Sequence, residues 1–440
     1  MTTSVSSVSR TFRFSGDLSA LTAEDGRLLF NRSASSDREI TRIVGDIIER
    51  VRVDGDDALF SLARDLDQAT LETLEVPRET LRNALAAVEP RVIEGMQHAA
   101  RNIERVHRAL LPEASRIEVE PGVVITRRPD PLGRVGVYAP GGRALYPSSV
   151  LMGAIPARIA GVEEIILCSP PASDGIPTAV VLAAAEIAGV HRVFAVGGAG
   201  AIAAMAFGTA SVPRVDKIVG PGNAFVAEAK LQLTDVVAFD CPAGPSELLV
   251  IADDTASPEV VAREVVAQAE HDVRAIALVL AIGREAAARI EVAILDIVDS
   301  QPRRDIICES LSRFGGVLRV DDVAQAIDAA SRFAPEHLLV ATRDPKAVSD
   351  RIRNAGAIFL GETSSVSFGD YITGGNHVLP TGGLAKSYSG LSTDDFVRWT
   401  MVQGIDASAA ARLASDTAVF AEAEGLHAHA AAARAWGGAA

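Results

Sequence analysis

The chain has 440 residues, of which 48% are hydrophobic, and carries a formal net charge of −15 at pH 7. This length predicts two or three domains with sizeable cores, and the acidic balance argues against a nucleic-acid-binding protein, which would show a basic face. The N-terminus lacks the apolar segment of a secretory signal, and the longest apolar run, 275–283, is far too short to cross a bilayer. We therefore expect a soluble, cytoplasmic protein.

The cysteines point to the same compartment. Cys168, Cys241 and Cys308 are odd in number and far apart, and they form no C-x-x-C pair. This pattern indicates neither a disulfide framework nor a thiolate zinc site, and it favours a reducing environment.

The periodicity of apolar residues changes along the chain. Residues 40–110 carry them at three- and four-residue spacing, which predicts helices. From Gly122 short β-rich runs alternate with helical stretches, as in parallel βαβ units. The expected strands lie at 134–140, 163–168, 192–197 and 216–220, and in a second series at 247–253, 275–283, 315–320, 337–342 and 357–361. The sequence thus predicts two α/β domains, with the helical N-terminal segment packed on one of them.

The C-terminal part has a different composition. A Gly/Thr/Ser-rich loop spans 374–390, and the Ala-rich residues 393–437 are expected to be helical. This last segment is too small for a core of its own, so we expect it to dock on the body or on another subunit.

Glycines mark two candidate phosphate-binding turns. Gly198, Gly200 and Ala203 have the G-x-G-x-x-A spacing of a dinucleotide-binding turn, but the nearest acid, Asp216, precedes the following strand rather than ending it. As a dinucleotide signature the first turn is weak, and it fits a small-residue turn in a nucleotide-binding domain. The run GPGNAFVAEAK, 220–230, again places glycines before a helix, where backbone amides could meet a phosphate.

Gln268 and His271 are three residues apart near the end of a helix expected at 257–272. Ser257 suits its N-cap and Pro258 its first turn. The two side chains would share one face and could bind a metal, although glutamine is an unusual ligand. The alternative is a solvated helix end.

Glu336 and His337 lie between an amphipathic helix and an apolar strand. A histidine beside a carboxylate is a common proton-transfer couple. The alternative is a cation that favours the C-terminus of the helix.

The run GETSSVSFGDYITGGNHVLPT, 361–381, is long, polar and glycine-rich, and it contains Asp370, Asn376 and His377. Long irregular loops of α/β domains often carry functional residues. We therefore favour a functional loop over a plain surface loop.

Six stretches occur in one order along the chain: YAPGGRALYPSSVLM, GPGNAFVAEAK, PAGPSELLVIAD, QAEHD, APEHL and GNHVLPT. Together they resemble the histidinol dehydrogenase family over nearly the whole chain. The resemblance implies an NAD-dependent zinc enzyme that oxidises L-histidinol through the aldehyde to L-histidine with two NAD+.

The resemblance also implies roles for individual residues. Glu336 would activate water and His337 would be the general base. The ligands of one Zn2+ per subunit would be Gln268, His271, Asp370 and His429. Ser246, His377 and Glu424 would contact the substrate together with the zinc ligands and His337, and Tyr138, Gly200 and Asn223 would lie at the NAD+ site.

The fold that the resemblance implies consists of two incomplete Rossmann-like parallel-sheet domains, a helical N-terminal segment and a helical C-terminal tail. Residues 1–36 would be an N-terminal arm, 37–137 with 246–391 the domain carrying zinc and the catalytic residues, 138–245 an inserted NAD-side domain, and 392–440 a tail. The family forms an intertwined homodimer, so His429 and Glu424 would come from the partner subunit.

Two positions depart from a simple match. Gly200 stands where the family usually has a glutamine that contacts NAD+. His427 and His429 lie about 200° apart around an ideal helix, which would place Glu424 beside His427 instead. We follow the motif and expect either that the helix is irregular there or that the two residues serve different parts of the pocket. Three other functions stay open: a paralogue acting on another small primary alcohol such as a sulfonated diol, a zinc hydrolase without a nucleotide, and a non-catalytic metal-binding protein.

Overall fold

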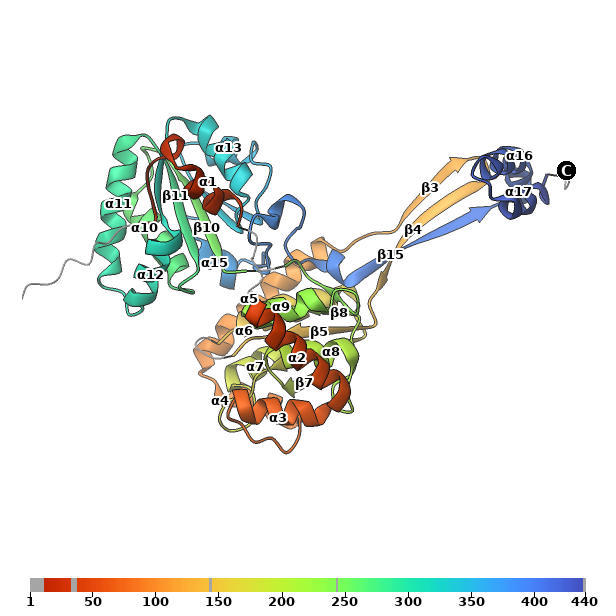
Figure 1. Ribbon diagram of the computed structural model, residues 1–440, viewed down its shortest axis with the longest axis horizontal. Coiled ribbons are helices and arrows are strands. Elements are labelled where there is room, and N and C mark those ends of the chain that lie inside the picture. The colour runs from red at the N-terminus through yellow and green to blue at the C-terminus, as the bar shows by residue number, and fades with distance from the viewer. Residues whose placement is uncertain (1–11, 33–37, 142–144, 243, 438–440) are drawn as a thin grey trace, which may run out of the picture.

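The structure is a computed structural model that describes residues 12–32, 38–141, 145–242 and 244–437. It contains two α/β domains, each on a six-stranded sheet, and an arm with a three-stranded sheet that projects away from both (Figure 1). The mixed α/β class with parallel sheets is confirmed. Across the described ranges, no helix combines the length and the apolar character needed to cross a membrane.

The first domain has the strand order β2-β7-β6-β5-β8-β9. Only β2 runs antiparallel, to β7. The strands are β2 (Glu75–Val76), β5 (Arg134–Tyr138), β6 (Glu164–Ser169), β7 (Arg192–Ala195), β8 (Lys217–Val219) and β9 (Ala238–Phe239). Because β6 and β8 flank β5, the strand order reverses there, and loops at the carboxyl ends of such strands commonly hold ligands.

Two layers of helices cover this sheet. Three inner helices are apolar on nearly all sides: α6 (Pro147–Ala160), α7 (Ala179–Ala188) and α8 (Gly198–Phe207). The fourth, α9 (Ala224–Gln232), also carries Glu228, Lys230 and Gln232. The outer helices are amphipathic: α2 (Arg38–Asp54), α3 (Asp56–Leu66), α4 (Arg78–Ala87) and α5 (Pro90–Ala109). Helix α2 packs on α8 and α9, α4 on α7, and α5 on α6 and α7. A helix without a polar face needs cover on both sides, which explains why the outer layer lies here.

This packing differs from the expected grouping of 37–137 with 246–391. Helices α2–α5 and strand β5 belong to the core of the first domain. Amphipathic periodicity shows that a helix has a buried face, but not which sheet that face covers. The helical segment packs on one α/β domain, as expected. That domain is the first one, however, and not the domain of residues 246–391.

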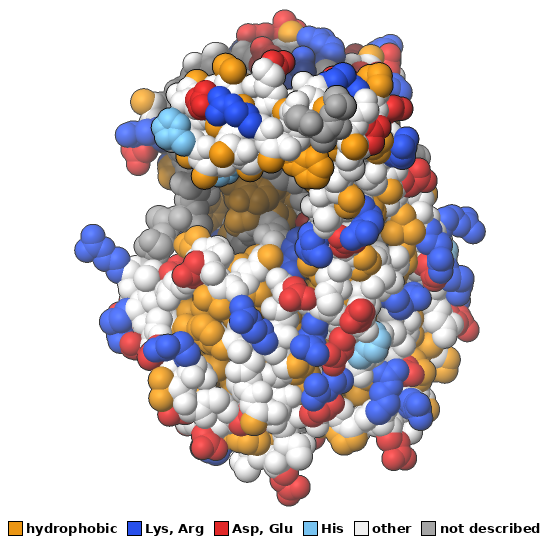
Figure 2. All heavy atoms as spheres, turned by 90° about the vertical axis from the view of Figure 1, so that its right-hand side faces the viewer, with side chains coloured by type: hydrophobic (Ala, Val, Ile, Leu, Met, Phe, Trp, Pro, Cys, Tyr) orange, Lys and Arg blue, Asp and Glu red, His pale blue; other side chains and the backbone are white. Residues whose placement is uncertain are grey.

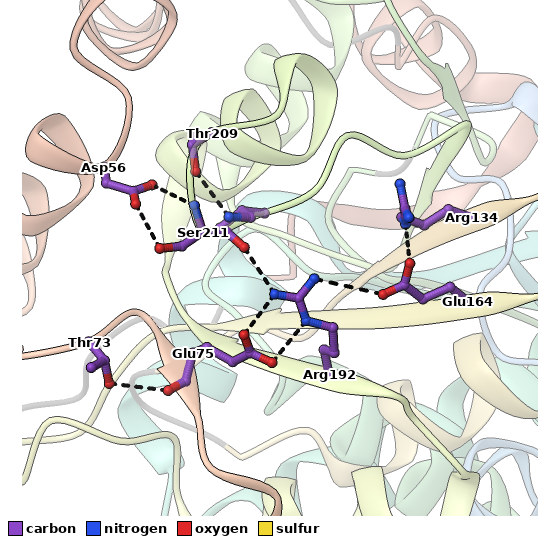
Figure 3. A network of polar contacts seen from close by, with 9 residues as sticks. Asp56, Thr73, Glu75, Arg134, Glu164, Arg192, Thr209 and Ser211 are labelled. Atoms are coloured by element: carbon purple, nitrogen blue, oxygen red, sulfur yellow. Dashed lines mark hydrogen bonds and ion pairs between the residues drawn. The ribbon is translucent and has the colours of Figure 1, made fainter.

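Polar contacts fasten this segment to the sheet (Figure 3). Arg192, at the start of β7, pairs through Nη2 with Oε2 of Glu75 in β2 at 2.7 Å and donates to the carbonyl of Ser211 at 3.2 Å. The Ser211 hydroxyl donates to Asp56 of α3 at 2.7 Å. The contacts lie at the amino ends of the strands, so they leave the carboxyl edge of the sheet open for other roles.

The second domain has a fully parallel sheet in the order β1-β12-β11-β10-β13-β14. Its strands are β1 (Phe14–Asp17), β10 (Glu247–Ala252), β11 (Ile276–Ile282), β12 (Gly316–Val320), β13 (His337–Ala341) and β14 (Ala357–Leu360). Its helices are α1 (Ala23–Phe30), α10 (Pro258–Ala269), α11 (Arg284–Val298), α12 (Arg304–Phe314), α13 (Val323–Phe333), α14 (Pro345–Ser349) and α15 (Val366–Tyr371). The expected N-terminal arm therefore contributes β1 and α1 to this domain.

The arm joins segments from distant parts of the chain. Strands β3 (Ser115–Glu120), β4 (Val123–Pro131) and β15 (Val397–Ile405) form an antiparallel sheet in the order β15-β4-β3. Helices α16 (Ala407–Ala423) and α17 (His427–Arg434) pack together at its tip. Figure 2 shows the molecule hollowed beneath the arm, with hydrophobic side chains at the back of the hollow.

The prediction of helix throughout 393–437 is wrong for residues 397–405, which form β15. This strand pairs with β4 along its whole length. Its partner lies more than 250 residues earlier in the chain, so local periodicity could not reveal the pairing.

Candidate active site

Glu336 and His337 lie where helix α13 passes into strand β13. The helix ends at Phe333, and Ala334 follows in the left-handed region with φ of 52°. Glu336 and His337 come next and are 6% and 5% exposed. The histidine begins the strand between β10 and β14. The pair is therefore buried at the amino end of the second sheet.

Both side chains bond to the same residue of the neighbouring strand. The backbone N–H of Glu247 donates to Oε2 of Glu336 at 2.7 Å. The Nδ1 atom of His337 lies 3.2 Å from the carbonyl oxygen of Glu247. A carbonyl oxygen can only accept, so Nδ1 carries the hydrogen in this contact. The other ring nitrogen, Nε2, lies 3.4 Å from Oδ1 of Asp370.

The three groups shift one another's ionisation. Burial raises the pKa of Glu336, and His337 and the Glu247 amide offset only part of this effect. Burial by itself lowers the pKa of His337, but Glu336 and Asp370 outweigh it and raise the pKa. Burial favours the neutral acid of Asp370, whereas contact with His337 favours the carboxylate and leaves the pKa lowered. These are the opposed shifts of an acid–base site.

Gln268 and His271 lie at the amino edge of the same sheet. Ser257 caps α10 as expected, accepting from the N–H of Val260 at 3.5 Å. The helix ends at Ala269 rather than 272, so His271 lies in the turn beyond it, and its N–H donates to the carbonyl of Gln268 at 3.3 Å. The expected common helix face is therefore wrong, because His271 is outside the helix.

The side chain of Gln268 is 4% exposed, and its Nε2 has no hydrogen-bond partner among the residues the structure describes. A buried amide without a partner is unfavourable. Rotation of the amide presents its oxygen at the same position, so this side chain fits a role as ligand to a cation.

Asp370 does not lie in an irregular loop, as expected, but in the short helix α15. Its backbone carbonyl accepts from Nδ1 of His377 at 2.8 Å, and Nε2 of His377 lies 3.5 Å from the Ser149 hydroxyl of the first domain. Burial lowers the pKa of both His271 and His377, and the nearby Asp370 carboxylate offsets only part of this effect. The structure thus gathers His271, His337, Asp370 and His377.

The remaining tail residues lie elsewhere. His429 and Glu424 are exposed at the tip of the arm, far from α15 (Figure 1). Within the described residues, no group of three His, Cys, Asp or Glu side chains is placed to hold a metal ion. Gln268, His271 and Asp370 all belong to the second domain, and the fourth expected ligand, His429, does not join them within this chain.

The expected irregularity near His429 is confirmed. Helix α16 ends at Ala423, Glu424 is its C-cap, and Gly425 follows with φ of 77°. Helix α17 then begins at His427. Glu424 and His427 are thus on different helices, and the spacing argument for a shared face does not apply.

The residues expected at the NAD+ site follow the carboxyl ends of three strands: Tyr138 ends β5, Gly200 lies in α8 beyond β7, and Asn223 lies beyond β8. The N–H of Gly198, the first residue of α8, donates to the Tyr138 hydroxyl at 3.1 Å. Burial raises the pKa of that phenol to about 12. Asn223 caps α9, and its Oδ1 accepts from the N–H groups of Phe225 and Val226 at 3.0 and 3.2 Å.

Gly200 lies in the contact between α8 and α3. A Cβ atom there would be 2.9 Å from Cδ1 of Leu62 and 3.6 Å from Cδ2 of Leu59. A side chain at this position would press on the ends of two leucine side chains, so Gly200 lies at a close helix contact, and its contact with NAD+ stays a prediction.

Ser246 lies at the head of β10, where its carbonyl accepts from Ile276 at 2.9 Å. The sequence argument missed its neighbour Glu247, which is 1% exposed. The available signal was one charged residue at the start of the otherwise apolar strand ELLVIA.

Comparison with known proteins gives one family. The family model described as histidinol dehydrogenase matches residues 30–436. The histidinol dehydrogenase of Methanothermobacter thermautotrophicus is 48% identical over 387 residues, which cover 88% of this chain and 91% of that protein. The Methanosarcina mazei protein of the same name is 44% identical over 409 residues, covering 93% of this chain and 94% of the relative.

A solved structure agrees with these relatives. The crystal structure of histidinol dehydrogenase from Elizabethkingia anophelis matches with a TM-score of 0.91 and 34% sequence identity, covering 97% of this chain and 98% of the other. The family match covers nearly the whole chain and includes the buried Glu336–His337 pair. The chain therefore belongs to the histidinol dehydrogenase family.

Proposed function

We propose that the protein oxidises L-histidinol through L-histidinaldehyde to L-histidine and reduces two NAD+ in the process. The observation that carries this proposal is the buried Glu336–His337 pair, which bonds to Glu247 and faces Asp370. Such a pair is suited to acid–base chemistry next to groups that bind an oxygen- or nitrogen-bearing substrate.

His337 acts on the alcohol. In the neutral ring Nδ1 donates to Glu247 and Nε2 holds the lone pair, so Nε2 is the atom that takes the hydroxyl proton of histidinol. NAD+, when bound, would take the C–H electron pair as hydride, and the aldehyde would form. Glu336 takes a proton from water as the water adds to the aldehyde. A second NAD+ would take the hydride of the hydrate, and the resulting carboxylic acid would release its proton to give the carboxylate.

The zinc proposal is consistent with the residues present. Gln268, His271 and Asp370, with His429 of the partner subunit, would hold one Zn2+ per subunit. The donors are nitrogen and oxygen atoms, which suit Zn2+, and the Gln268 amide, whose Nε2 has no partner among the described residues, fits such a ligand. When bound, the ion would orient the imidazole and amine of histidinol, which Ser246, His377 and the partner's Glu424 would also contact.

An intertwined homodimer would bring the tail to this site. Exposed apolar side chains lie along β15 and the helices beyond it: Met401, Val402, Ile405, Val419, Phe420, Leu426 and Trp436. An exposed apolar surface of this extent commonly marks a protein interface. A partner that covers it would supply His429 and Glu424 to the body of the first subunit.

The NAD+ site would lie at the carboxyl edge of the first sheet, among Tyr138, Gly200 and Asn223. The order β7-β6-β5-β8-β9 is that of a dinucleotide-binding sheet without its sixth strand. The same order recurs in the second domain from β12 to β14, which supports two incomplete Rossmann-like domains. We further propose that the enzyme works in the cytoplasm, in keeping with three free cysteines.

The test is NADH absorbance with L-histidinol and NAD+, before and after removal of metal by a chelator. We expect two NADH per histidinol, loss of turnover after chelation, and recovery with Zn2+. No turnover by the zinc-loaded protein would contradict the proposal, and turnover of a sulfonated diol but not of histidinol would favour the paralogue.

A further inference from the structure

We propose that Arg32 and Glu247 are positioning residues for the Glu336–His337 pair. Their buried ion pair fixes the peptide to which both catalytic side chains are hydrogen-bonded. This inference rests on the proposed function, since it concerns the geometry of the same acid–base pair.

The peptide groups of Glu247 touch both catalytic residues. Its N–H donates to Oε2 of Glu336 at 2.7 Å, and its carbonyl oxygen is 3.2 Å from Nδ1 of His337. A shift of this residue therefore moves the carboxylate and the imidazole together. It also removes the contact that keeps the hydrogen of the neutral His337 ring on Nδ1.

The Glu247 side chain is held from two sides. Its Oε1 accepts from Nε of Arg32 at 2.9 Å and from the N–H of Gly382 at 2.9 Å, and its Oε2 accepts from Nη2 of Arg32 at 3.1 Å. The two-point contact matches the planar guanidinium to the carboxylate. The side chains are 6% and 2% exposed, so water offers no alternative partner.

Arg32 is anchored in turn to the helix that leads into the site. Its Nη2 donates to the carbonyl of Phe333 at 2.8 Å, and its guanidinium carbon lies 3.4 Å from the centroid of the Phe333 ring. Its Nη1 donates to the carbonyl of Leu29 at 2.8 Å. Phe333 ends α13, three residues before Glu336. Arg32 therefore connects the head of β10 to the turn that presents the catalytic pair.

Burial of an ion pair does not by itself explain this arrangement. The cost of removing two charges from water commonly equals or exceeds their attraction, and apolar replacements are often as stable. The pair differs from a purely structural contact because the residue that it holds, Glu247, is hydrogen-bonded through its peptide groups to both catalytic side chains.

The test compares Arg32→Met, Arg32→Lys, Glu247→Gln and the double variant Arg32→Met/Glu247→Gln. Arg13→Met is the matched control, because it breaks another ion pair of the N-terminal segment, Arg13–Asp25 at 2.6 Å, without contact to the site. We measure kcat per zinc-loaded site for L-histidinol and for L-histidinaldehyde, KM for NAD+, zinc content and thermal unfolding.

We expect Arg32→Met to lower kcat by about 10- to 100-fold for both substrates, the size of loss that misplaced catalytic groups produce. KM for NAD+ and zinc content should stay within about twofold, and Arg32→Lys should recover part of kcat. The double variant removes both buried charges, so it should regain thermal stability while kcat stays low. Arg13→Met should match the wild type.

A double variant that regains kcat along with stability would overturn the inference, and so would Arg32→Met with unchanged kcat per site. If Arg32→Met does not fold, the kcat values of Arg32→Lys and Glu247→Gln test the inference instead, because each variant keeps a polar group in place. Failure of the wild type to oxidise histidinol would instead contradict the proposed function.

Discussion

The ammonium group of Lys230 lies 2.6 Å from Oδ1 of Asp240 and 2.6 Å from the carbonyl oxygen of Gly220. The other carboxylate oxygen of Asp240 accepts from the N–H of Gly220 at 2.7 Å. Both side chains are largely buried. The pair thus holds both sides of the residue that begins the loop 220–223, where we place part of the NAD+ site.

Replacement of Lys230 by Met should therefore weaken NAD+ binding. We expect KM for NAD+ to rise by about tenfold, as the loss of one well-placed charged contact allows, with kcat at saturating NAD+ little changed. Stability should fall by about 3 kcal/mol, because Asp240 would be left buried and unpaired.

Steady-state kinetics and urea unfolding check both effects. Lys346→Met is the matched control, since Lys346 and Asp350 form an exposed pair, also at 2.6 Å. An unchanged KM for NAD+ in Lys230→Met would show that the loop 220–223 is not part of the nucleotide site.

Gly220→Ala should disturb the same loop from its backbone. Gly220 has φ of 118°, and a Cβ atom would lie 2.1 Å from the carbonyl oxygen of Tyr138. The side chain clashes with backbone, so we expect a loss of more than about 2 kcal/mol of stability and a raised KM for NAD+. Gly95→Ala in α5 meets open space and should add about 0.5–1 kcal/mol. Thermal unfolding of both variants makes the comparison, and a neutral Gly220→Ala would contradict the requirement for glycine at this position.

The sequence predicted strands well where both faces of a strand are buried. Runs such as ELLVIA and IALVLAI are apolar along their whole length, which is typical of central parallel strands. It also predicted that Glu336, His337 and Asp370 belong to one site, but through motifs of the family rather than through spacing.

Contacts between distant segments could not be predicted. Arg32 and Glu247 are 215 residues apart, and nothing in either local sequence specifies the other. The same holds for β15 and β4, and for the sheet that α2–α5 cover. Local patterns determine which face of an element is buried, and only the tertiary fold determines its partner.

His107 should make the protein sensitive to acid. Burial lowers its pKa from 6.5 to about 4, and neither ring nitrogen has a hydrogen-bond partner among the described residues. The unfolded chain therefore binds this proton more readily than the folded chain. The stability that the neutral His107 ring contributes is fully present above about pH 6.5 and is lost as the pH falls toward 4.

His107→Leu should remove this dependence, because leucine has no proton to bind. We expect a higher melting temperature than wild type at pH 5 and a smaller difference at pH 8. His98→Leu, an exposed change on the same helix, is the control for added hydrophobicity. Equal melting temperatures of wild type and His107→Leu at pH 5 would show that another group governs the acid response.

Glu336→Gln should separate the two oxidation steps. The amide oxygen can still accept from the Glu247 N–H, so the fold of the site is kept, but the amide cannot take a proton from water. We expect oxidation of L-histidinaldehyde to slow by about 10²- to 10⁴-fold, the range for loss of a general base, and oxidation of histidinol to the aldehyde to slow much less. NADH formed per histidinol in single-turnover reactions should fall from two toward one. Equal slowing of both steps would contradict the role given to Glu336.

Dimers of two different inactive chains test whether each site is shared between two subunits. His429 lies at the tip of the arm, whereas Glu336 lies in the body. A Glu336→Gln chain and a His429→Ala chain should each be nearly inactive alone. After denaturation and refolding of an equal mixture, half of the dimers contain both chains, and each of these has one site with an intact body and an intact tail. The mixture should therefore recover about a quarter of wild-type activity, as symmetry of a closed dimer requires.

A mixture of Glu336→Gln and His337→Gln chains is the control and should recover none, because both changes lie in the body. Activity that stays at the level of the separate variants would show that the tail serves its own subunit or none.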